Sequence, residues 1–235
     1  FGEGGTFLTF PALVYAGLPV LAANATNAEA VFYGYLGGAG SSPERGTREV
    51  RTEKRSMRVL VLGAGVIGMT ILQMARALGI EEIIVTDVIN ERLTAAKELG
   101  ATHVLNSREQ EVEKEVLALT QGEGVPLIAD AACVPALLPQ MLRLASPAGR
   151  IGLLGFSVQP SELVQLEVIK KELTLVGSRL SNRKFPEVLK LMESGRLDPL
   201  ALVSHRLPLS DMPNAIDMLD HRPEEARKVL ISIGA

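Results

Sequence analysis

Three glycines, Gly63, Gly65 and Gly68, follow the G-x-G-x-x-G spacing that can hold a phosphate group against the backbone. The first would permit a sharp turn, and the second would let backbone N–H groups approach a pyrophosphate. The third would let the next helix pack closely on a sheet, and the N-terminus of that helix offers free N–H donors to an anion. The predicted phosphate site therefore consists of Gly63, Gly65, Val66, Ile67 and Gly68.

The residues on either side of the glycines support this interpretation, because the spacing alone is a weak signal. The apolar, β-branched run 58–62 predicts a strand that is covered on both faces. After the turn, Ile71, Met74 and Leu78 recur at helical spacing, and Gly79 suits a helix end. The stretch thus predicts a strand, a glycine turn and a helix in succession.

Asp87 provides a second element of the same pattern. It ends the predicted strand 82–87, about 20 residues beyond the glycines, where a dinucleotide-binding fold has an acidic residue. Its carboxylate could accept hydrogen bonds from both ribose hydroxyls and would repel a 2′-phosphate. These features predict NAD rather than NADP, and the alternative is a solvated aspartate at a strand end.

Composition limits the classes of protein to which the chain can belong. Its 235 residues, 47% of them hydrophobic, suffice for one large domain or two small ones, and its net charge of −3 leaves no basic stripe for nucleic acid. One cysteine, Cys133, and three histidines predict no disulfide and no metal site. Cys133 has no recognisable histidine partner nearby in sequence, so we expect a small buried wall residue rather than a nucleophile.

Strand and helix patterns alternate from residue 58 onward, which predicts an α/β fold with a doubly wound parallel sheet. Six strands would complete two mononucleotide-binding halves of a Rossmann domain over residues 58–205. The expected strands after 58–62 are 83–87, 103–105, 126–130, 150–155 and 173–177. The expected helices after the glycine turn begin near Asn90, at Glu109, at Pro135 and near Lys184.

Residues 1–43 have a different composition, with no charge between Gly4 and Ala28. Pro11, Gly17 and Pro19 interrupt the apolar run, so it predicts an apolar helical arm rather than an ordinary membrane-spanning helix. The segments 2–12, 22–27 and 33–38 resemble the start of the TauE/SafE family of membrane anion exporters. This resemblance covers too little chain for a transport pathway, and an apolar arm that packs on another surface is the alternative. Residues 44–57 are rich in charges of both signs and predict a linker.

From about Arg58 to the end, the chain resembles the nucleotide-binding half of the medium-chain dehydrogenase/reductase superfamily, of the zinc alcohol dehydrogenase type. The segments 61–68, 86–87, 96–101, 149–155 and 226–231 carry this resemblance. Within the superfamily, segments 130–133, 155–157 and 177–182 are most similar to polyol and sugar-acid dehydrogenases. The expected activity is NAD-dependent oxidation of such an alcohol.

The resemblance also implies positions for the cofactor. Arg92 would lie near the adenine, although a plain surface arginine is an equal alternative. The ends of the fourth to sixth strands would line the nicotinamide, mostly through backbone groups, and the implied residues are Asp130, Ala131, Leu154, Gly155, Phe156, Ser178, Arg179 and Asn182.

The catalytic domain that family members carry before this half, with its zinc ligands and proton relay, has no counterpart in residues 1–57. Zinc is thus expected for the family without ligands in this chain, and no catalytic residue is assigned. In relatives the tail, residues 206–235, returns to that domain, so we expect here a mobile or edge-exposed strand prone to dimerisation.

Three functions follow as hypotheses from these patterns. The first is an NAD-dependent polyol or sugar-acid dehydrogenase of which the chain holds mainly the cofactor half. The second is a non-catalytic NAD-binding module left by truncation or fusion. The third is a membrane-associated fusion whose arm determines its location. The expected location is cytoplasmic unless the arm binds a membrane, and the expected partners are a dinucleotide, an alcohol substrate and a second copy of the chain.

Overall fold

The computed structural model describes residues 57–155, 157–178 and 184–233. These residues form the elements β1 Arg58–Leu62, α3 Val66–Ala77, β2 Glu82–Asp87, α4 Asn90–Glu98, β3 His103–Asn106, α5 Val112–Leu119, β4 Val125–Asp130, α6 Leu137–Leu144, β5 Ala145–Leu153, α7 Gln165–Lys170, β6 Thr174–Gly177, α8 Phe185–Glu193, η1 Pro199–Leu202, β7 His205–Pro208, η2 Leu209–Asp211, α9 Met212–His221 and β8 Val229–Ser232. The arm predicted for 1–43 and nearly all of the linker predicted for 44–57 lie outside the described residues.

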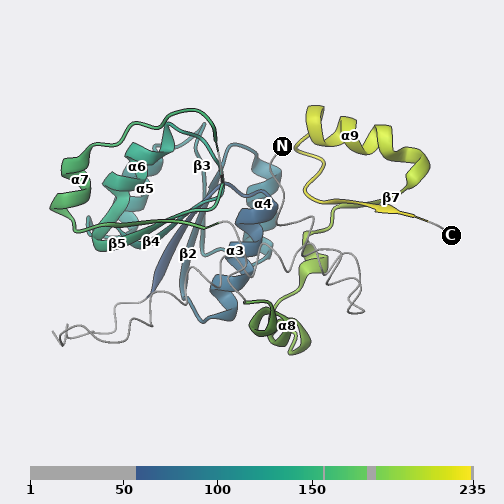
Figure 1. The fold of residues 1–235 in the computed structure, drawn as a ribbon, viewed down its shortest axis with the longest axis horizontal. Coiled ribbons are helices and arrows are strands. Elements are labelled where there is room, and N and C mark those ends of the chain that lie inside the picture. Colours follow the sequence, from purple (N-terminus) through teal and green to yellow (C-terminus); the bar gives the residue numbers. More distant parts are fainter. Residues whose placement is uncertain (1–56, 156, 179–183, 234–235) are drawn as a thin grey trace.

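Six strands form one parallel sheet in the order β3-β2-β1-β4-β5-β6 (Figure 1). This is the strand order of the doubly wound dinucleotide-binding fold, so the predicted six-stranded Rossmann sheet is confirmed. The direction of winding reverses between β1 and β4, which lie side by side. Ligands of such sheets bind at the carboxyl ends of the strands beside that reversal. The glycine turn leaves β1 at this place.

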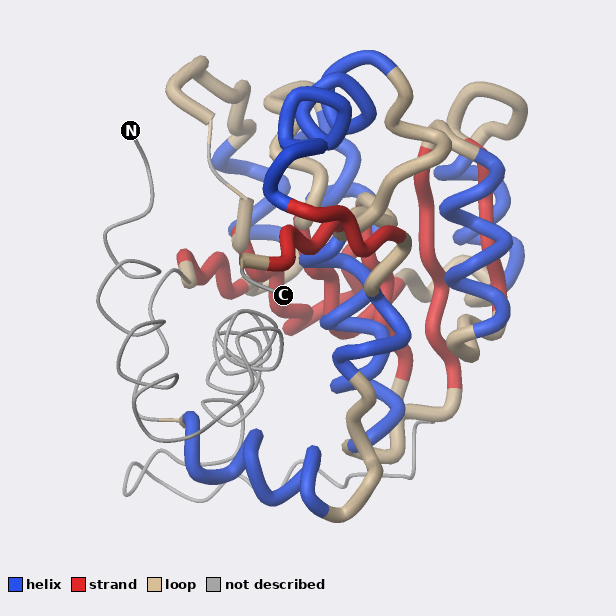
Figure 2. Tube along the Cα trace, turned by 90° about the vertical axis from the view of Figure 1, so that its right-hand side faces the viewer, coloured by secondary structure: helices blue, strands red, loops and turns tan. Residues whose placement is uncertain are grey.

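The alternation of side chains along β1 explains why helices cover both faces of the sheet (Figure 2). Val59 and Val61 lie in the core cluster that contains α3, α4 and α8, while Leu60 and Leu62 lie in the cluster that contains α5 and α6. All four side chains are buried, and full burial of each stabilises the fold by about 1.5–3 kcal/mol. The apolar run 58–62 therefore holds the glycine turn on a rigid central strand.

Two predicted helix starts differ from the structure. Helix α5 begins at Val112 rather than Glu109, because the Asn106 side chain accepts the Arg108 N–H at 2.9 Å while the Gln110 side chain accepts the Asn106 N–H at 3.0 Å. Such side-chain bonds favour turns over helix. Helix α6 begins at Leu137, and Pro135 lies in the turn before it instead of in its first helical turn.

Strand β8 of the tail has a strand partner within the chain, which the prediction of a mobile or edge-exposed strand did not specify. It pairs in parallel with β7, from His205 opposite Val229 to Pro208 opposite Ser232. Ser204 secures the start of this pair, because its N–H donates to the Lys228 carbonyl at 3.0 Å and its hydroxyl accepts the Arg227 N–H at 3.0 Å. In the described part of the chain this sheet has two strands, so an outer edge of each strand stays unpaired.

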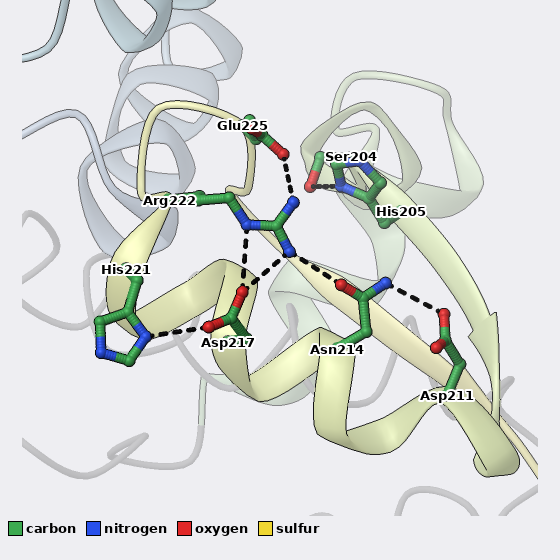
Figure 3. A network of polar contacts seen from close by, with 8 residues as sticks. All are labelled: Ser204, His205, Asp211, Asn214, Asp217, His221, Arg222 and Glu225. Atoms are coloured by element: carbon green, nitrogen blue, oxygen red, sulfur yellow. Dashed lines mark hydrogen bonds and ion pairs between the residues drawn. The ribbon is translucent and has the colours of Figure 1, made fainter.

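A polar network on α9 organises the segment between β7 and β8 (Figure 3). The Arg222 guanidinium lies at its centre and contacts Asp217 at 3.1 Å, Glu225 at 3.0 Å and Asn214 at 2.8 Å. His221 contacts the same Asp217 at 3.1 Å and is largely exposed. These contacts are structural, and Figure 1 shows α9 and β7 set apart from helices α5 to α7.

Candidate functional site

The glycine turn has the geometry that its sequence predicts. Gly63 has φ +93°, a backbone conformation that favours glycine, and its N–H donates to the Thr86 carbonyl at 2.8 Å. A Cβ atom on Gly63 would lie 3.0 Å from the Ala132 Cα atom. The turns after β1 and β4 are therefore in contact at the winding reversal.

Gly68 and Gly65 differ in the space around them, because Gly68 is closely packed and Gly65 is open. A Cβ atom on Gly68 would lie 1.8 Å from the Gly63 carbonyl oxygen, so glycine is required for α3 to pack against the turn. A Cβ atom on Gly65 would meet nothing within 4 Å. Gly65 is also the N-cap of α3, and among the described residues no side chain caps this helix. The first-turn N–H groups of α3 thus have no side-chain cap among the described residues, as an anion site at a helix N-terminus requires.

The Asp87 carboxylate is tied to the backbone around it. Its Oδ2 accepts the Ala64 N–H at 2.6 Å, and its Oδ1 accepts the N–H groups of Val88 at 2.7 Å and Ile89 at 3.0 Å. Asp87 is only 9% exposed. A carboxylate has about four acceptor positions, so these bonds leave about one for a ribose hydroxyl. Asp87 therefore also orients the glycine turn, a role that its position in the sequence does not indicate.

Arg92, which the resemblance places near the adenine, contacts the C-terminal segment in this structure. It lies on α4, and its Nη2 donates to the Pro223 carbonyl at 3.1 Å. Its Nε is buried without a hydrogen-bond partner among the described residues. Arg92 thus connects the Rossmann domain to the loop that follows α9.

The turns after β4 and β5 interlock beside the glycine turn. The Asp130 carbonyl accepts the Leu154 N–H at 3.1 Å and the Gly155 N–H at 3.0 Å, and the Ala131 N–H donates to the Leu62 carbonyl at 2.8 Å. A Cβ atom on Gly155 would lie 1.9 Å from the Cys133 Sγ atom. Cys133 is partly buried, so its predicted role as a wall residue agrees with this packing.

The predicted nicotinamide residues are placed in part. The Ser178 N–H donates to the Leu153 carbonyl at 3.0 Å, which brings the end of β6 next to the end of β5. Asp130, Ala131, Leu154, Gly155 and Ser178 thus lie at the carboxyl ends of neighbouring strands, on the same edge of the sheet as the glycine turn. Phe156, Arg179 and Asn182 lie outside the described residues.

The Asp130 carboxyl lines a pocket of about 260 Å³ between the end of β4 and α6, together with Cys133, Leu138, Met141 and Ser157. Burial raises the pKa of this carboxyl above its usual range, although the N–H groups of Cys133 and Ala132 act in the opposite direction. Its Oδ1 accepts these two N–H groups at 3.2 and 3.1 Å. Asp130 therefore supports the backbone at Cys133, whose φ of +59° is uncommon outside glycine.

The stability of the D130N variant, measured relative to the wild type at the same pH, should increase as the pH rises. Above the ordinary pKa of 3.8, the unfolded chain releases the Asp130 proton while the folded wild type retains it. The stability of the wild type therefore falls as the pH rises from 3.8 to the raised pKa. Above the raised pKa, the free-energy cost of a buried charge on Asp130 remains. An asparagine removes this cost while its Oδ1 can accept the same two N–H groups.

Urea unfolding from about pH 4 to about pH 8 tests this expectation. The D198N variant is the control. The Asp198 carboxylate is exposed and also accepts two N–H groups, those of Leu200 at 2.9 Å and Ala201 at 3.3 Å. A stability difference between D130N and the wild type that does not change with pH would contradict the proposed cost of burial.

Sequence reasoning missed a polar cluster beside Asp87, which consists of Asn90, Asn106 and Glu109. Asn106 on β3 lies opposite Asp87 on the neighbouring strand β2, with their Cα atoms in register. The signal available in the sequence was an asparagine at a strand end and another at a helix start, both common hydrogen-bonding positions. We call these three residues the Asn90 cluster.

Two observations concern the expected absence of a metal site and the proposed membrane arm. Within the described ranges, no three His, Cys, Asp or Glu side chains gather into a group that could hold a metal ion. In the same ranges, the helices are too short or too polar to cross a membrane. The resemblance of residues 1–43 to exporters concerns residues that the structure does not describe.

Comparisons with known proteins point to one family. The family described as "Zinc-binding dehydrogenase" matches residues 66–194, more than half of the chain. "Starvation-sensing protein RspB" of Escherichia coli K12 is 38% identical over 175 residues, which cover 74% of this chain and 51% of that protein. An L-threonine 3-dehydrogenase of Bacillus velezensis is 31% identical over 176 residues, or 73% and 50% of the two chains. A sorbitol dehydrogenase of Bacillus subtilis is 29% identical over 174 residues, or 74% and 49%. The chain therefore spans about half the length of these curated relatives.

A solved structure gives the same result for the fold. RspB from Escherichia coli CFT073, described as a short chain alcohol dehydrogenase complexed with NADH, superposes with a TM-score of 0.78 at 32% sequence identity. The superposition covers 92% of this chain and 60% of that one.

Proposed function

This chain belongs to the zinc-binding dehydrogenase family, and on that premise we propose that its Rossmann domain, residues 58–205, binds NAD⁺ or NADH. The observation that carries the proposal is the open space at Gly65 in front of the uncapped N-terminus of α3. A pyrophosphate placed there would accept hydrogen bonds from the N–H groups of Val66 and Ile67 and would gain from the partial positive charge of the helix. The NADH-bound relative, 32% identical, supports the choice of cofactor.

The position of Asp87 determines where the adenosine would lie. Its remaining acceptor position would bind a ribose hydroxyl, and its bond to the Ala64 N–H keeps the glycine turn in the shape that receives the pyrophosphate. A 2′-phosphate at this carboxylate would be repelled, which favours NAD over NADP. Arg92 could still approach the adenine edge of the site if its bond to the Pro223 carbonyl were exchanged.

The other half of the dinucleotide would extend toward the ends of β4 to β6. Asp130, Ala131, Leu154, Gly155 and Ser178 stand there, and the sequence adds Phe156, Arg179 and Asn182. The backbone groups of these turns would hold the nicotinamide amide, while the Gly63 and Ala132 backbones form the floor below. The residues would thus bind and orient the nicotinamide ring.

For the complete protein we propose oxidation of a secondary alcohol of a polyol or sugar acid. When bound, NAD⁺ accepts a hydride from the alcohol carbon, which leaves a carbonyl product and a proton. The similarity to a sorbitol dehydrogenase and the polyol-type segments 130–133 and 177–182 support this substrate class. We assign no catalytic residue and no step to zinc, because the described residues offer no group of ligands for it.

A non-catalytic NAD-binding module is the second candidate function. It rests on the same open space at Gly65 and the same uncapped N-terminus of α3, and it needs no residue outside the Rossmann domain. The two candidates share the same NAD site and differ only in turnover.

Calorimetric titration with NAD⁺ and NADH, followed by a turnover assay with sorbitol, L-threonine and L-gulonate with and without added zinc, tests both functions. We expect binding of both nucleotides. Substrate-dependent NADH formation would select the dehydrogenase, and binding without NADH formation would select the module. A chain that is folded by circular dichroism but binds neither nucleotide would refute the shared NAD site.

A further inference from the structure

We infer that Glu109 is a second specificity-determining carboxylate, which acts together with Asp87 to exclude a 2′-phosphorylated dinucleotide. This inference rests on the proposed NAD site and adds a residue to it. The evidence is the Asn90 cluster, which holds the Glu109 carboxylate in one place beside the end of β2.

Two amide groups fix the Glu109 side chain although the residue is exposed. Its Oε1 accepts hydrogen bonds from the Asn90 Nδ2 at 3.0 Å and the Asn106 Nδ2 at 3.1 Å. The Asn106 Nδ2 also donates to the Asn90 Oδ1 at 2.8 Å, and Asn106 is only 5% exposed. A buried amide thus anchors the carboxylate, so its negative charge stays at a defined position rather than moving freely in solvent.

The cluster lies at the strand ends that the adenosine would occupy. The Cα atoms of Asp87 and Asn106 are in register on neighbouring strands, which stand about 4.8 Å apart. The Ser107 N–H donates to the Asp87 carbonyl at 3.0 Å, and Asn90 follows Asp87 at the start of α4. Through Asn90 and Asn106, the Glu109 carboxylate is therefore held beside the strand ends that carry Asp87.

The cations near this edge do not cancel both carboxylates. The Arg92 side chain donates to the Pro223 carbonyl. Arg108 is exposed, and it is the Arg108 backbone N–H that bonds to the cluster, at the Asn106 Oδ1. Among the described residues, neither arginine side chain forms an ion pair with the Asp87 or the Glu109 carboxylate. A doubly charged 2′-phosphate would therefore meet two fixed negative charges, whereas the 2′-hydroxyl of NAD would not.

The test replaces Glu109 with glutamine, which removes the charge while its Oε1 can still accept from Asn90 and Asn106. Dissociation constants of NAD⁺ and NADP⁺ are measured by competition with NADH fluorescence at low and at high salt. We expect E109Q to bind NADP⁺ about three- to tenfold more tightly than the wild type at low salt, with NAD⁺ affinity unchanged within about twofold. The gain should shrink at high salt, which a purely structural role of Glu109 would not produce.

The E111Q variant is the control, because Glu111 is an exposed carboxylate in the same loop that lacks bonds to the Asn90 cluster. An equal gain in E111Q and E109Q, or an unchanged ratio of the two affinities in E109Q, would overturn the inference while leaving the NAD site intact. Failure of the wild type to bind NAD⁺ or NADH would instead refute the proposed function itself. If E109Q proves unstable, E109K provides a second variant, and its charge reversal should give a larger gain for NADP⁺.

Discussion

Replacement of Gly65 by valine should weaken NAD⁺ binding about 100-fold and leave the fold intact. A side chain here would project into the open space where the pyrophosphate is proposed to lie, because a Cβ atom on Gly65 meets nothing within 4 Å. Displacement of the phosphates from the N-terminus of α3 would cost one or two charge-assisted hydrogen bonds, each worth about 1.5–3 kcal/mol. A loss of about 2.8 kcal/mol corresponds to that factor of 100.

The fold should tolerate this change because Gly65 has φ −76° and ψ −169°, an extended conformation open to any residue. Valine is a poorer N-cap than glycine, so we expect a loss of stability of about 1 kcal/mol or less. Calorimetry gives the affinity, and thermal unfolding gives the stability. The G65A variant provides a graded control with a smaller side chain and a smaller loss of affinity. Unchanged NAD⁺ affinity in G65V would refute the placement of the pyrophosphate.

The G68A variant should instead lose stability, by about 3 kcal/mol or more. Its new methyl group would lie 1.8 Å from the Gly63 carbonyl oxygen and 2.9 Å from the Gly63 carbonyl carbon. These are backbone atoms of a turn, so they cannot rotate aside as a long side chain would. Helix α3 would have to move away from β1, and overpacking of this kind costs about 1–3 kcal/mol or more.

Urea unfolding of G68A and of G65A measures this loss of stability. The two variants carry the same substitution at two glycines of one turn. The Gly68 change should shift the unfolding midpoint strongly, and the Gly65 change should shift it little. Since α3 also carries the N–H groups of the phosphate site, NAD⁺ affinity should fall in the folded fraction of G68A. Equal stability of the two variants would show that α3 can pack on the turn without close contact at Gly68.

The strand, turn and helix around Gly63 and the six-stranded sheet could be predicted from the sequence. These features depend on neighbours a few residues apart: the alternating burial of residues 59–62, the helical spacing after Gly68, and the glycine conformation at Gly63. Asp87 could be identified as the acidic residue for the same reason, because its distance from the glycines follows from one helix and one strand.

The contacts of the polar side chains at this edge of the sheet could not be predicted from the sequence, because they depend on the packing of the whole fold. The bonds from Asp87 to Ala64, from Asn106 to Asn90 and from Arg92 to Pro223 join residues far apart in the chain. The register of β2 against β3 and the return of the C-terminal segment bring them together, and no local pattern encodes either. The pairing of β8 with β7 was missed for the same reason, since a strand's hydrophobic pattern reveals that it needs a partner but not which segment will supply it.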